Sequence, residues 1–163
     1  MGFERIFEGL NKHEVRYLII GGMAVNLYGY DRVTGDIDIM MSFNKQNVLK
    51  LEGFMKEYGF KPGVPVDIKE LADAGKRKEW IEEKNAKVFK IYNPGNMLEV
   101  VDIMIMEYID FEQAYKRMEY TKKGLKLPLI SIDDLIRLKE IAGRERDLTD
   151  IRALKIIKEA RDE

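Results

Sequence analysis

Short apolar runs alternate along this chain with stretches in which apolar residues recur every three or four positions. The runs are rich in β-branched and aromatic residues, so they predict strands. They cover residues 15–20, 37–41, 88–92, 98–106 and 125–130. The third and fourth runs are joined by Asn93-Pro94-Gly95-Asn96, a turn sequence that predicts a hairpin and therefore an antiparallel pair of strands.

The stretches with helical spacing predict helices over residues 3–13, 23–27, 44–58, 111–118, 131–142 and 147–160. Ser131 is a good N-cap for the fifth of these helices, and Gly143 is a good stop. Proline and glycine predict a loop at residues 61–65. The lysine-rich segment 67–85 has few apolar positions, and it fits a helix, a broken helix or a mobile segment.

The order of these elements predicts the fold class. Strands with interspersed helices, followed by two terminal helices, indicate an α+β fold with a mixed, mainly antiparallel sheet packed by helices. A length of 163 residues is typical of one domain. We therefore expect a single domain over residues 1–163, with its core at about 14–130 and a C-terminal helical segment at about 131–163.

Two glycines end the first strand run, and two carboxylates open the second. Gly21 and Gly22 have no Cβ, so the chain can turn sharply there, and the N–H groups of the following helix can face a phosphate. Asp36 and Asp38 are two residues apart on a predicted strand, which places them on one face about 7 Å apart at Cα. Hard oxygen ligands in this arrangement suit Mg²⁺ that also binds substrate phosphates.

A third carboxylate lies inside the longest apolar run. Asp102 is flanked by Val101 and Ile103, and a charge in such a run is costly unless it is paired or binds a metal. Strand alternation points Val101 and Ile103 to one face of the sheet and Asp102 to the other, with Val100 and Met104. Asp102 completes a metal site if its face also carries Asp36 and Asp38; otherwise it is an isolated structural carboxylate.

These residues resemble the signature of the DNA polymerase-β-like nucleotidyltransferase superfamily, in which a glycine turn is followed by Asp-apolar-Asp and a later strand carries a third carboxylate. The wider string from Gly21 to Asp38 is similar to that of small stand-alone prokaryotic nucleotidyltransferases related to the abortive-infection toxins. Many of those relatives have Ser where Gly22 stands and His where Tyr28 stands.

The resemblance implies a sheet of the polymerase-β type and a specific reaction. A nucleoside monophosphate would pass from a nucleoside triphosphate such as ATP to an acceptor hydroxyl, with release of pyrophosphate. Two divalent cations, Mg²⁺ or Mn²⁺, are expected during catalysis. The implied catalytic and metal-binding residues are Asp36, Asp38 and Asp102, and the implied nucleotide-binding residues are Gly21, Gly22, Arg32 and Lys139.

The C-terminal segment adds a further resemblance. Lys139 and the run from Gly143 to Ile151 are similar to a segment that packs near the nucleotide site in the narrower family. Two simpler interpretations remain open. Arg146 and Asp150 are four residues apart, as in a helix-surface ion pair, and Asp147 and Asp150 could serve only to cap or pin the two terminal helices.

The bulk composition excludes some kinds of chemistry and leaves the acceptor open. The chain has no cysteine, which excludes disulfides and thiolate catalysis, and a net charge of −1, which gives no overall attraction to nucleic acid. No signal-peptide pattern and no apolar run long enough to span a membrane is found, so a cytoplasmic protein without a membrane partner is expected.

The sequence leaves the acceptor and the oligomeric state open. A tRNA, a protein or a small molecule could each accept the nucleotide. The basic residues between 76 and 87 could meet an RNA, or they could form a solvated helix face. An alternative to the enzyme is a nucleotide-binding regulatory or toxin–antitoxin-type module without turnover.

Overall fold

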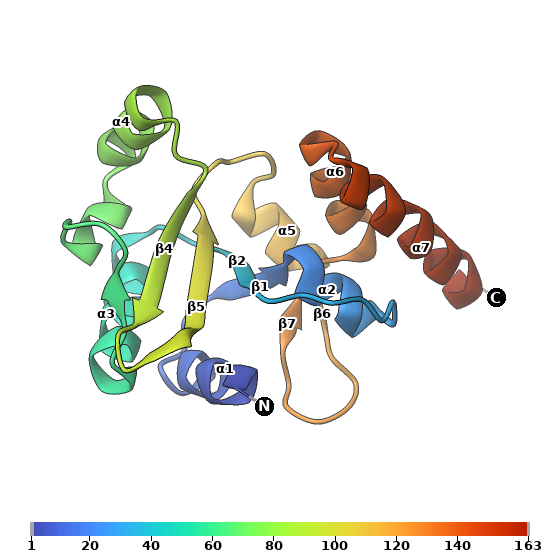
Figure 1. Cartoon of the computed structure of the whole chain (residues 1–163), viewed down its shortest axis with the longest axis horizontal. Coiled ribbons are helices and arrows are strands. Elements are labelled where there is room, and N and C mark those ends of the chain that lie inside the picture. The colour runs from blue at the N-terminus through green and yellow to red at the C-terminus, as the bar shows by residue number, and fades with distance from the viewer. Residues whose placement is uncertain (1, 163) are drawn as a thin grey trace.

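The computed structural model describes residues 2–162, and its centre is a seven-stranded sheet with the order β3-β4-β5-β2-β1-β7-β6 (Figure 1). The strands are β1 (Tyr17–Ile20), β2 (Ile37–Met41), β3 (Lys61–Pro62), β4 (Val88–Asn93), β5 (Asn96–Met104), β6 (Glu119–Tyr120) and β7 (Pro128–Leu129). The helices are α1 (Gly2–Lys12), α2 (Gly21–Tyr28), α3 (Lys45–Tyr58), the 3₁₀ helix η1 (Ile68–Ala72), α4 (Ala74–Lys84), α5 (Phe111–Arg117), α6 (Ile132–Ala142) and α7 (Glu145–Asp162).

The sheet is mixed and mainly antiparallel, as the order of elements predicts. β1 pairs with β2, β3 with β4, β4 with β5, and β6 with β7 in antiparallel fashion, whereas β1–β7 and β2–β5 are parallel. The predicted hairpin joins β4 to β5. The fold class predicted from the sequence is therefore confirmed.

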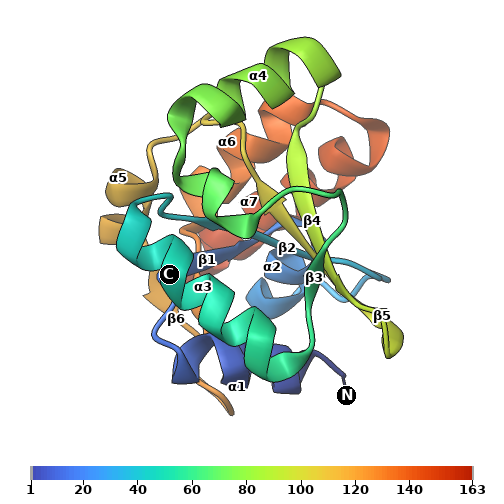
Figure 2. The ribbon, with the colours of Figure 1, turned by 90° about the vertical axis from the view of Figure 1, so that its left-hand side faces the viewer.

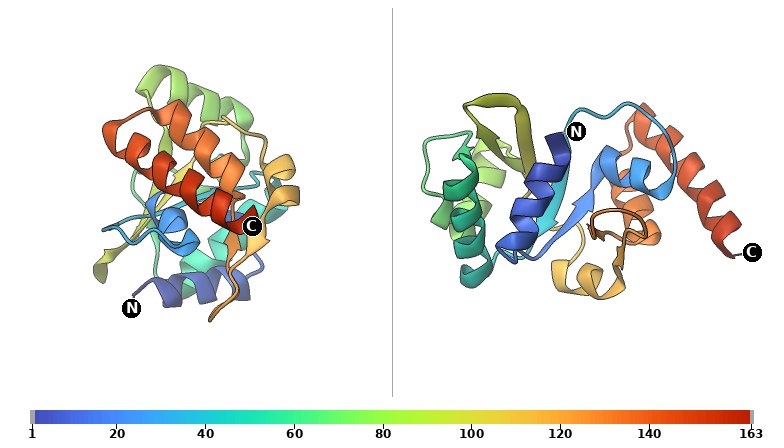
Figure 3. Two further views of the ribbon diagram at one scale, coloured as in Figure 1. Left: turned by 90° about the vertical axis from the view of Figure 1, so that its right-hand side faces the viewer. Right: turned by 90° about the horizontal axis from the view of Figure 1, so that it is seen from below.

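Helices cover the two faces of the sheet differently. Helix α1 packs against α3 on one face (Figure 2). There the ring of Phe7 stacks on that of Tyr17, with centroids 6.2 Å apart. Tyr17 is therefore buried beneath α1. On the opposite side, α2 contacts α6 and α7, which run next to each other at the C-terminal end of the chain (Figure 3).

Three segments differ from the sequence-based predictions in their extent. The predicted strand at 125–130 is reduced to Pro128–Leu129, because the Thr121 hydroxyl donates to the carbonyl of Leu125 at 2.8 Å and accepts from the amide of Leu127 at 3.0 Å, which closes a loop. The predicted loop at 61–65 begins with the short edge strand β3. Helix α2 begins at Gly21, so both glycines lie in its first turn.

The lysine-rich segment 67–85 forms a broken helix, one of the three forms that the sequence allows. Asp73 has extended backbone between η1 and α4, and its side chain accepts a hydrogen bond from the amide of Lys76 at 3.1 Å. Trp80 anchors α4 to the sheet, where its ring lies 5.5 Å from that of Phe89. No helix within residues 2–162 is long and apolar enough to cross a membrane.

Candidate active site

Two of the predicted carboxylates are placed side by side by the register of the sheet. Asp38 on β2 and Asp102 on β5 are direct partners across a parallel pair, so their side chains leave the same face of the sheet. The alternation along β5 agrees, because Val101 and Ile103 are buried while Asp102 is half-buried. The strand pairing thus gives Asp102 the face that completes a site with Asp38.

Asp36 lies one residue before β2, at the end of the loop that follows α2, and not on the strand itself. It still lines the same cavity as Asp38, Asp102 and Gly21, a hollow of about 470 Å³. The far wall of this cavity is formed by α6. The structure therefore brings together all three predicted carboxylates, together with the first glycine of the predicted turn.

Negative charge accumulates at Asp38. Burial of its carboxyl group, followed by the neighbouring charges of Asp102 and Asp36, raises the pKa of Asp38 from 3.8 to about 6. The positive charges of Lys139 and Arg144 act in the opposite direction with smaller effect. Such a group gains most from a cation that approaches it.

The donor atoms fit a divalent cation by their chemistry, but they do not form a finished metal site. Within residues 2–162, no three His, Cys, Asp or Glu side chains are grouped closely enough to hold a metal ion. On the neighbouring strand, the ammonium group of Lys90 lies 2.6 Å from Asp102 Oδ1 and occupies that oxygen. A cation bound by all three carboxylates requires Asp102 to exchange Lys90 for the metal.

The glycine turn places the start of α2 against the carboxylates. Gly21 has φ +71°, and a Cβ there would overlap the carboxylate of Asp38, so this position requires glycine. A Cβ on Gly22 would meet the guanidinium group of Arg32 and, at 2.8 Å, the hydroxyl of Thr34. The space over Gly22 is therefore occupied by Arg32, beside a small hollow of about 130 Å³ that the two glycines help to line.

Lys139 lines both hollows, but its ammonium group is already paired. It lies 3.3 Å from Asp147 Oδ1 and 3.0 Å from Asp150 Oδ2, and all three side chains are buried. Arg32 Nε lies 3.2 Å from the other oxygen of Asp150. Asp150 therefore has buried partners in place of the surface ion pair with Arg146 that its spacing suggests; that interpretation is wrong.

Asp147 is a helix-capping residue, as one of the sequence interpretations holds. Its carboxylate accepts a hydrogen bond from the backbone N–H of Arg144 at 3.1 Å, immediately before α7 begins. The guanidinium group of Arg144 donates to the same oxygen at 2.7 Å. Hydrogen bonds from Arg144 and the charge of Lys139 outweigh burial and lower the pKa of Asp147.

The family of the chain follows from a comparison with protein families. The family described as "Nucleotidyltransferase of unknown function (DUF6036)" matches residues 3–161. The chain belongs to this family. A comparison with curated proteins gives no match.

Solved structures similar to this DUF6036 nucleotidyltransferase share its fold at low sequence identity. The lincosamide antibiotic adenylyltransferase LnuA, solved with lincomycin bound, is 20% identical with a TM-score of 0.62, and the match covers 95% of each chain. A nucleotidyltransferase candidate from Thermotoga maritima is 16% identical with a TM-score of 0.57, over 96% of this chain and 91% of that one. ANT(2'')-Ia, solved with adenylyl-2''-tobramycin, is 13% identical with a TM-score of 0.57, over 97% and 93%. These likenesses bear out the predicted fold class.

Sequence reasoning missed several side chains that line the carboxylate cavity of the DUF6036 chain. Arg144 and Arg146 come from the junction of α6 and α7, Lys87 comes from directly before β4, and Tyr108 comes from the loop between β5 and α5. The resemblance of the run from Gly143 to Ile151 indicated that this segment packs near the nucleotide site, but it gave neither arginine a role. Arg146 lines both hollows and has no ion-pair partner in the described part of the chain.

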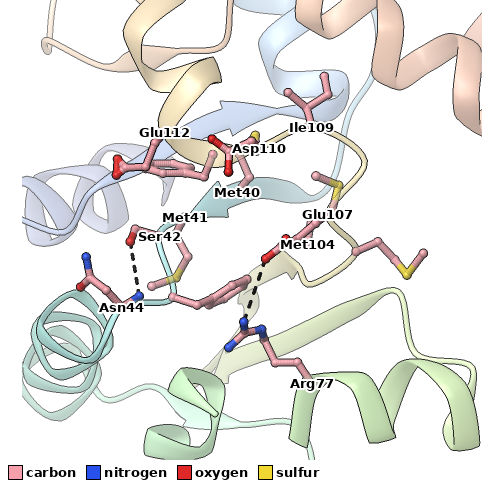
Figure 4. A pocket seen from close by; sticks show the side chains of 13 residues that line it. Met40, Met41, Ser42, Asn44, Arg77, Met104, Glu107, Ile109, Asp110 and Glu112 are labelled. Carbon is pink, nitrogen blue, oxygen red and sulfur yellow. Dashed lines mark hydrogen bonds and ion pairs between the residues drawn. The ribbon is translucent and has the colours of Figure 1, made fainter. Parts of the chain in front are cut away.

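A second cavity, of about 300 Å³, shares Met104 with the carboxylate cavity. Figure 4 shows the side chains that line this second cavity. Methionines form much of its lining, and Arg77 crosses it towards Glu107, with 4.0 Å between Nη2 and Oε1. Methionine side chains adapt readily to ligands of different shape. The DUF6036 chain thus has a second hollow of small-molecule size, which meets the carboxylate cavity at Met104.

Proposed function

We propose that this protein transfers a nucleoside monophosphate from a nucleoside triphosphate to an acceptor hydroxyl and releases pyrophosphate. The observation that carries the proposal is the register of β2 and β5, which aligns Asp38 with Asp102 on the face where α2 begins. Membership of a nucleotidyltransferase family supports it. In the reaction, the hydroxyl oxygen bonds to the α-phosphorus and the bond from that phosphorus to the β-phosphate bridge breaks.

The residues divide into two groups by their place around the cavity. The glycine turn leaves backbone N–H groups free at the start of α2, and Arg144 and Arg146 stand opposite as cationic ligands for the phosphates. The carboxylates lie on the sheet side, where the acceptor hydroxyl must approach. The proton of the hydroxyl leaves by way of a carboxylate oxygen, for which Asp102 is our candidate.

Asp36, Asp38 and Asp102 would hold the divalent cations, Mg²⁺ or Mn²⁺, of which we expect two during turnover. When bound, these cations neutralise charge on the phosphates and activate the acceptor oxygen. The residues fit this role by their oxygen chemistry. Burial and then the charges of Asp102 and Asp36 raise the pKa of Asp38, and a bound cation would offset both effects. Lys90 must leave Asp102 for the full ligand set to form.

A thermal-shift titration tests this proposal. Divalent cation together with triphosphate should stabilise the fold, because the ligand pair neutralises repulsion between carboxylates. At about 100 times the dissociation constant, the gain should be roughly 2.7 kcal/mol. Each of the four common triphosphates should be tested with Mg²⁺ and with Mn²⁺. An unchanged melting temperature in all eight mixtures would sink the proposal.

Among the three acceptor classes, we place a small molecule first. The cavity that shares Met104 with the carboxylate cavity offers about 300 Å³, close to the lower end of ordinary ligand sites. LnuA and ANT(2'')-Ia, which have the same fold, were solved with lincomycin and with an adenylylated tobramycin. Incubation of the protein with labelled triphosphate and fractionated lysate tests the choice of a small-molecule acceptor. Label in tRNA or in protein would overturn that choice.

The regulatory module without turnover is the second candidate function. The observation that favours it is the 2.6 Å contact between Lys90 and Asp102, which occupies a carboxylate that catalysis needs. Pyrophosphate release distinguishes the two functions. Slow release with water as acceptor, abolished by Asp38→Asn, supports the enzyme, whereas triphosphate binding without any release supports the module.

A further inference from the structure

Arg32 uses different nitrogens for two different contacts. Its Nε lies 3.2 Å from Asp150 Oδ1, while its Nη1 lies over Gly22, where a Cβ would overlap it. The backbone N–H of Arg32 donates to the side chain of Asn26 at 3.1 Å, which ties the loop to α2. The guanidinium group thus pairs with Asp150 through Nε and places Nη1 over the glycine turn.

Asp150 is buried without a capping role. It lies in the second turn of α7, is 1% exposed, and has Arg32 and Lys139 as its ion-pair partners. Asp147 differs, because it caps the helix and binds Arg144. Burial of a carboxylate inside a helix is costly unless it is paired, so the position of Asp150 requires an explanation beyond helix formation.

We propose that Asp150 is a positioning residue, which holds Arg32 over the glycine turn so that the outer nitrogens of Arg32 bind the phosphates of the nucleoside triphosphate. This proposal rests on the function proposed above. An arginine has five N–H donors in a planar fork, so one edge can bind a carboxylate while the other binds a phosphate. Lys139 contributes indirectly, because its ammonium group pairs with the second oxygen of Asp150 and so helps to position the carboxylate that pairs with Arg32.

The arrangement removes a cost from nucleotide binding. An arginine in a free loop must lose side-chain freedom when it binds phosphate, whereas Arg32 is only 20% exposed and already paired with Asp150 at Nε. Without Asp150, Arg32 keeps its charge but loses its orientation. The loss should therefore appear in triphosphate affinity.

The test measures the dissociation constant of the tightest-binding triphosphate by calorimetry, for wild type, Asp150→Ala and Asp150→Asn. Asp150→Ala should weaken binding about tenfold, the size expected for one charge-assisted contact. Asp150→Asn keeps an oxygen that can contact Nε of Arg32, so its affinity for the triphosphate should lie between those of wild type and Asp150→Ala. The matched control is Asp133→Asn, which removes an exposed ion pair between α6 and α7, with 2.7 Å to Lys158, and should leave the affinity unchanged.

A double-mutant cycle shows whether Asp150 acts through Arg32. Arg32→Ala should weaken triphosphate binding at least as much as Asp150→Ala, and the double variant should be no more than about twofold weaker than Arg32→Ala alone. Additive losses would overturn the proposal, because they would mean that Asp150 acts by another route. Affinities are expressed per folded molecule, from circular dichroism of the same samples.

Two other results separate the proposals. If Asp150→Ala lowers the melting temperature but binds triphosphate as wild type does, Asp150 is only structural and the inference fails while the proposed function stands. If Asp150→Ala does not fold, Arg32→Ala decides: unchanged affinity in that variant overturns the inference. If wild type binds none of the four triphosphates, the proposed function itself fails.

Discussion

The carboxylates on the two walls of the candidate site differ in how far nearby cations compensate their charge. On the sheet wall three carboxylates share one cavity, and the only cation paired with any of them in the described part of the chain is Lys90, on Asp102. On the helical wall the buried carboxylates Asp147 and Asp150 are each paired with cations. The sheet wall therefore has unused affinity for a cation, whereas the helical wall neutralises itself.

This difference separates residues for function from residues for structure. A carboxylate that is destabilised by its neighbours gains when a cation binds, and its replacement by a neutral group should stabilise the free protein. A carboxylate that is buried with its partners stabilises the fold only as long as the partners remain. Substitutions on the two walls should therefore change stability with opposite signs.

The largest effect should come from Asp38→Asn on nucleotidyl transfer. The substitution keeps the shape of the side chain but removes a charged ligand at the centre of the sheet wall. Transfer, followed as pyrophosphate release, should fall by roughly a factor of a thousand, since metal-assisted charge neutralisation is a major part of such catalysis. A variant that retains more than a tenth of wild-type transfer would remove Asp38 from the catalytic residues.

On the helical wall, Lys139→Met should be strongly destabilising. It leaves Asp147 and Asp150 buried with less positive charge, and breaking a buried pair of this kind costs about 3–5 kcal/mol. Chemical denaturation measures the loss. The matched control is Lys158→Met, because the exposed pair of Lys158 with Asp133 should contribute about 1 kcal/mol or less. If both variants lose the same free energy of unfolding, the buried ion pairs of Lys139 contribute no more to stability than an exposed pair does.

The pH dependence of Asp38→Asn should sharpen the comparison. The pKa of Asp38 is 3.8 in the unfolded chain and about 6 in the metal-free fold, so the folded state holds its proton to higher pH. Its contribution to stability is therefore present below pH 4 and is lost as the pH rises through 6. The difference of about two in pKa corresponds to roughly 3 kcal/mol as an upper value.

Metal-free Asp38→Asn should accordingly be more stable than wild type at pH 7, by about 1–3 kcal/mol, and equally stable at pH 3.5. Denaturation at both pH values, in the presence of a chelator, measures the difference. Asp133→Asn serves as the exposed control and should show no such pH-dependent gain. Equal or lower stability of Asp38→Asn at pH 7 would show that Asp38 is compensated in the free protein.

The sheet wall could be predicted from the sequence because its placement depends on local rules. Strand alternation gives the face of Asp102, and the glycine pair followed by Asp36 and Asp38 marks the turn and the next strand. The remaining requirement, that β2 and β5 be neighbours, came from the resemblance to a superfamily. The roles of these residues remain predictions, which the substitutions above test.

The helical wall could not be predicted in the same way. The partners of Asp150 are Lys139 on a different helix and Arg32 on a loop more than a hundred residues earlier. No spacing rule connects these positions, and the local rule for residues four apart gave the wrong partner, Arg146. The same limit applies to Lys90, which meets Asp102 only through the register of the β4–β5 hairpin.

The smallest effect on stability, and the finest test of the comparison, should come from Lys90→Met. Lys90 is half exposed and pairs with Asp102 at 2.6 Å, so loss of the ion pair should change the free energy of unfolding by about 1 kcal/mol or less. Methionine keeps the apolar stem of the lysine but removes its charge. Asp102 is then left without its cation, and the sheet wall becomes still more negative.

A divalent cation should therefore bind Lys90→Met several-fold more tightly than wild type, because the metal no longer competes with the ammonium group for Asp102. Titration of both proteins with Mn²⁺ by calorimetry, at fixed ionic strength, measures the difference. Lys87→Met is the matched control, since Lys87 lines the same cavity without an ion pair to a carboxylate within residues 2–162. If Lys90→Met binds Mn²⁺ more weakly than wild type, the ammonium group of Lys90 supports metal binding. The sheet wall would then not be the part of the site where uncompensated carboxylates favour a cation.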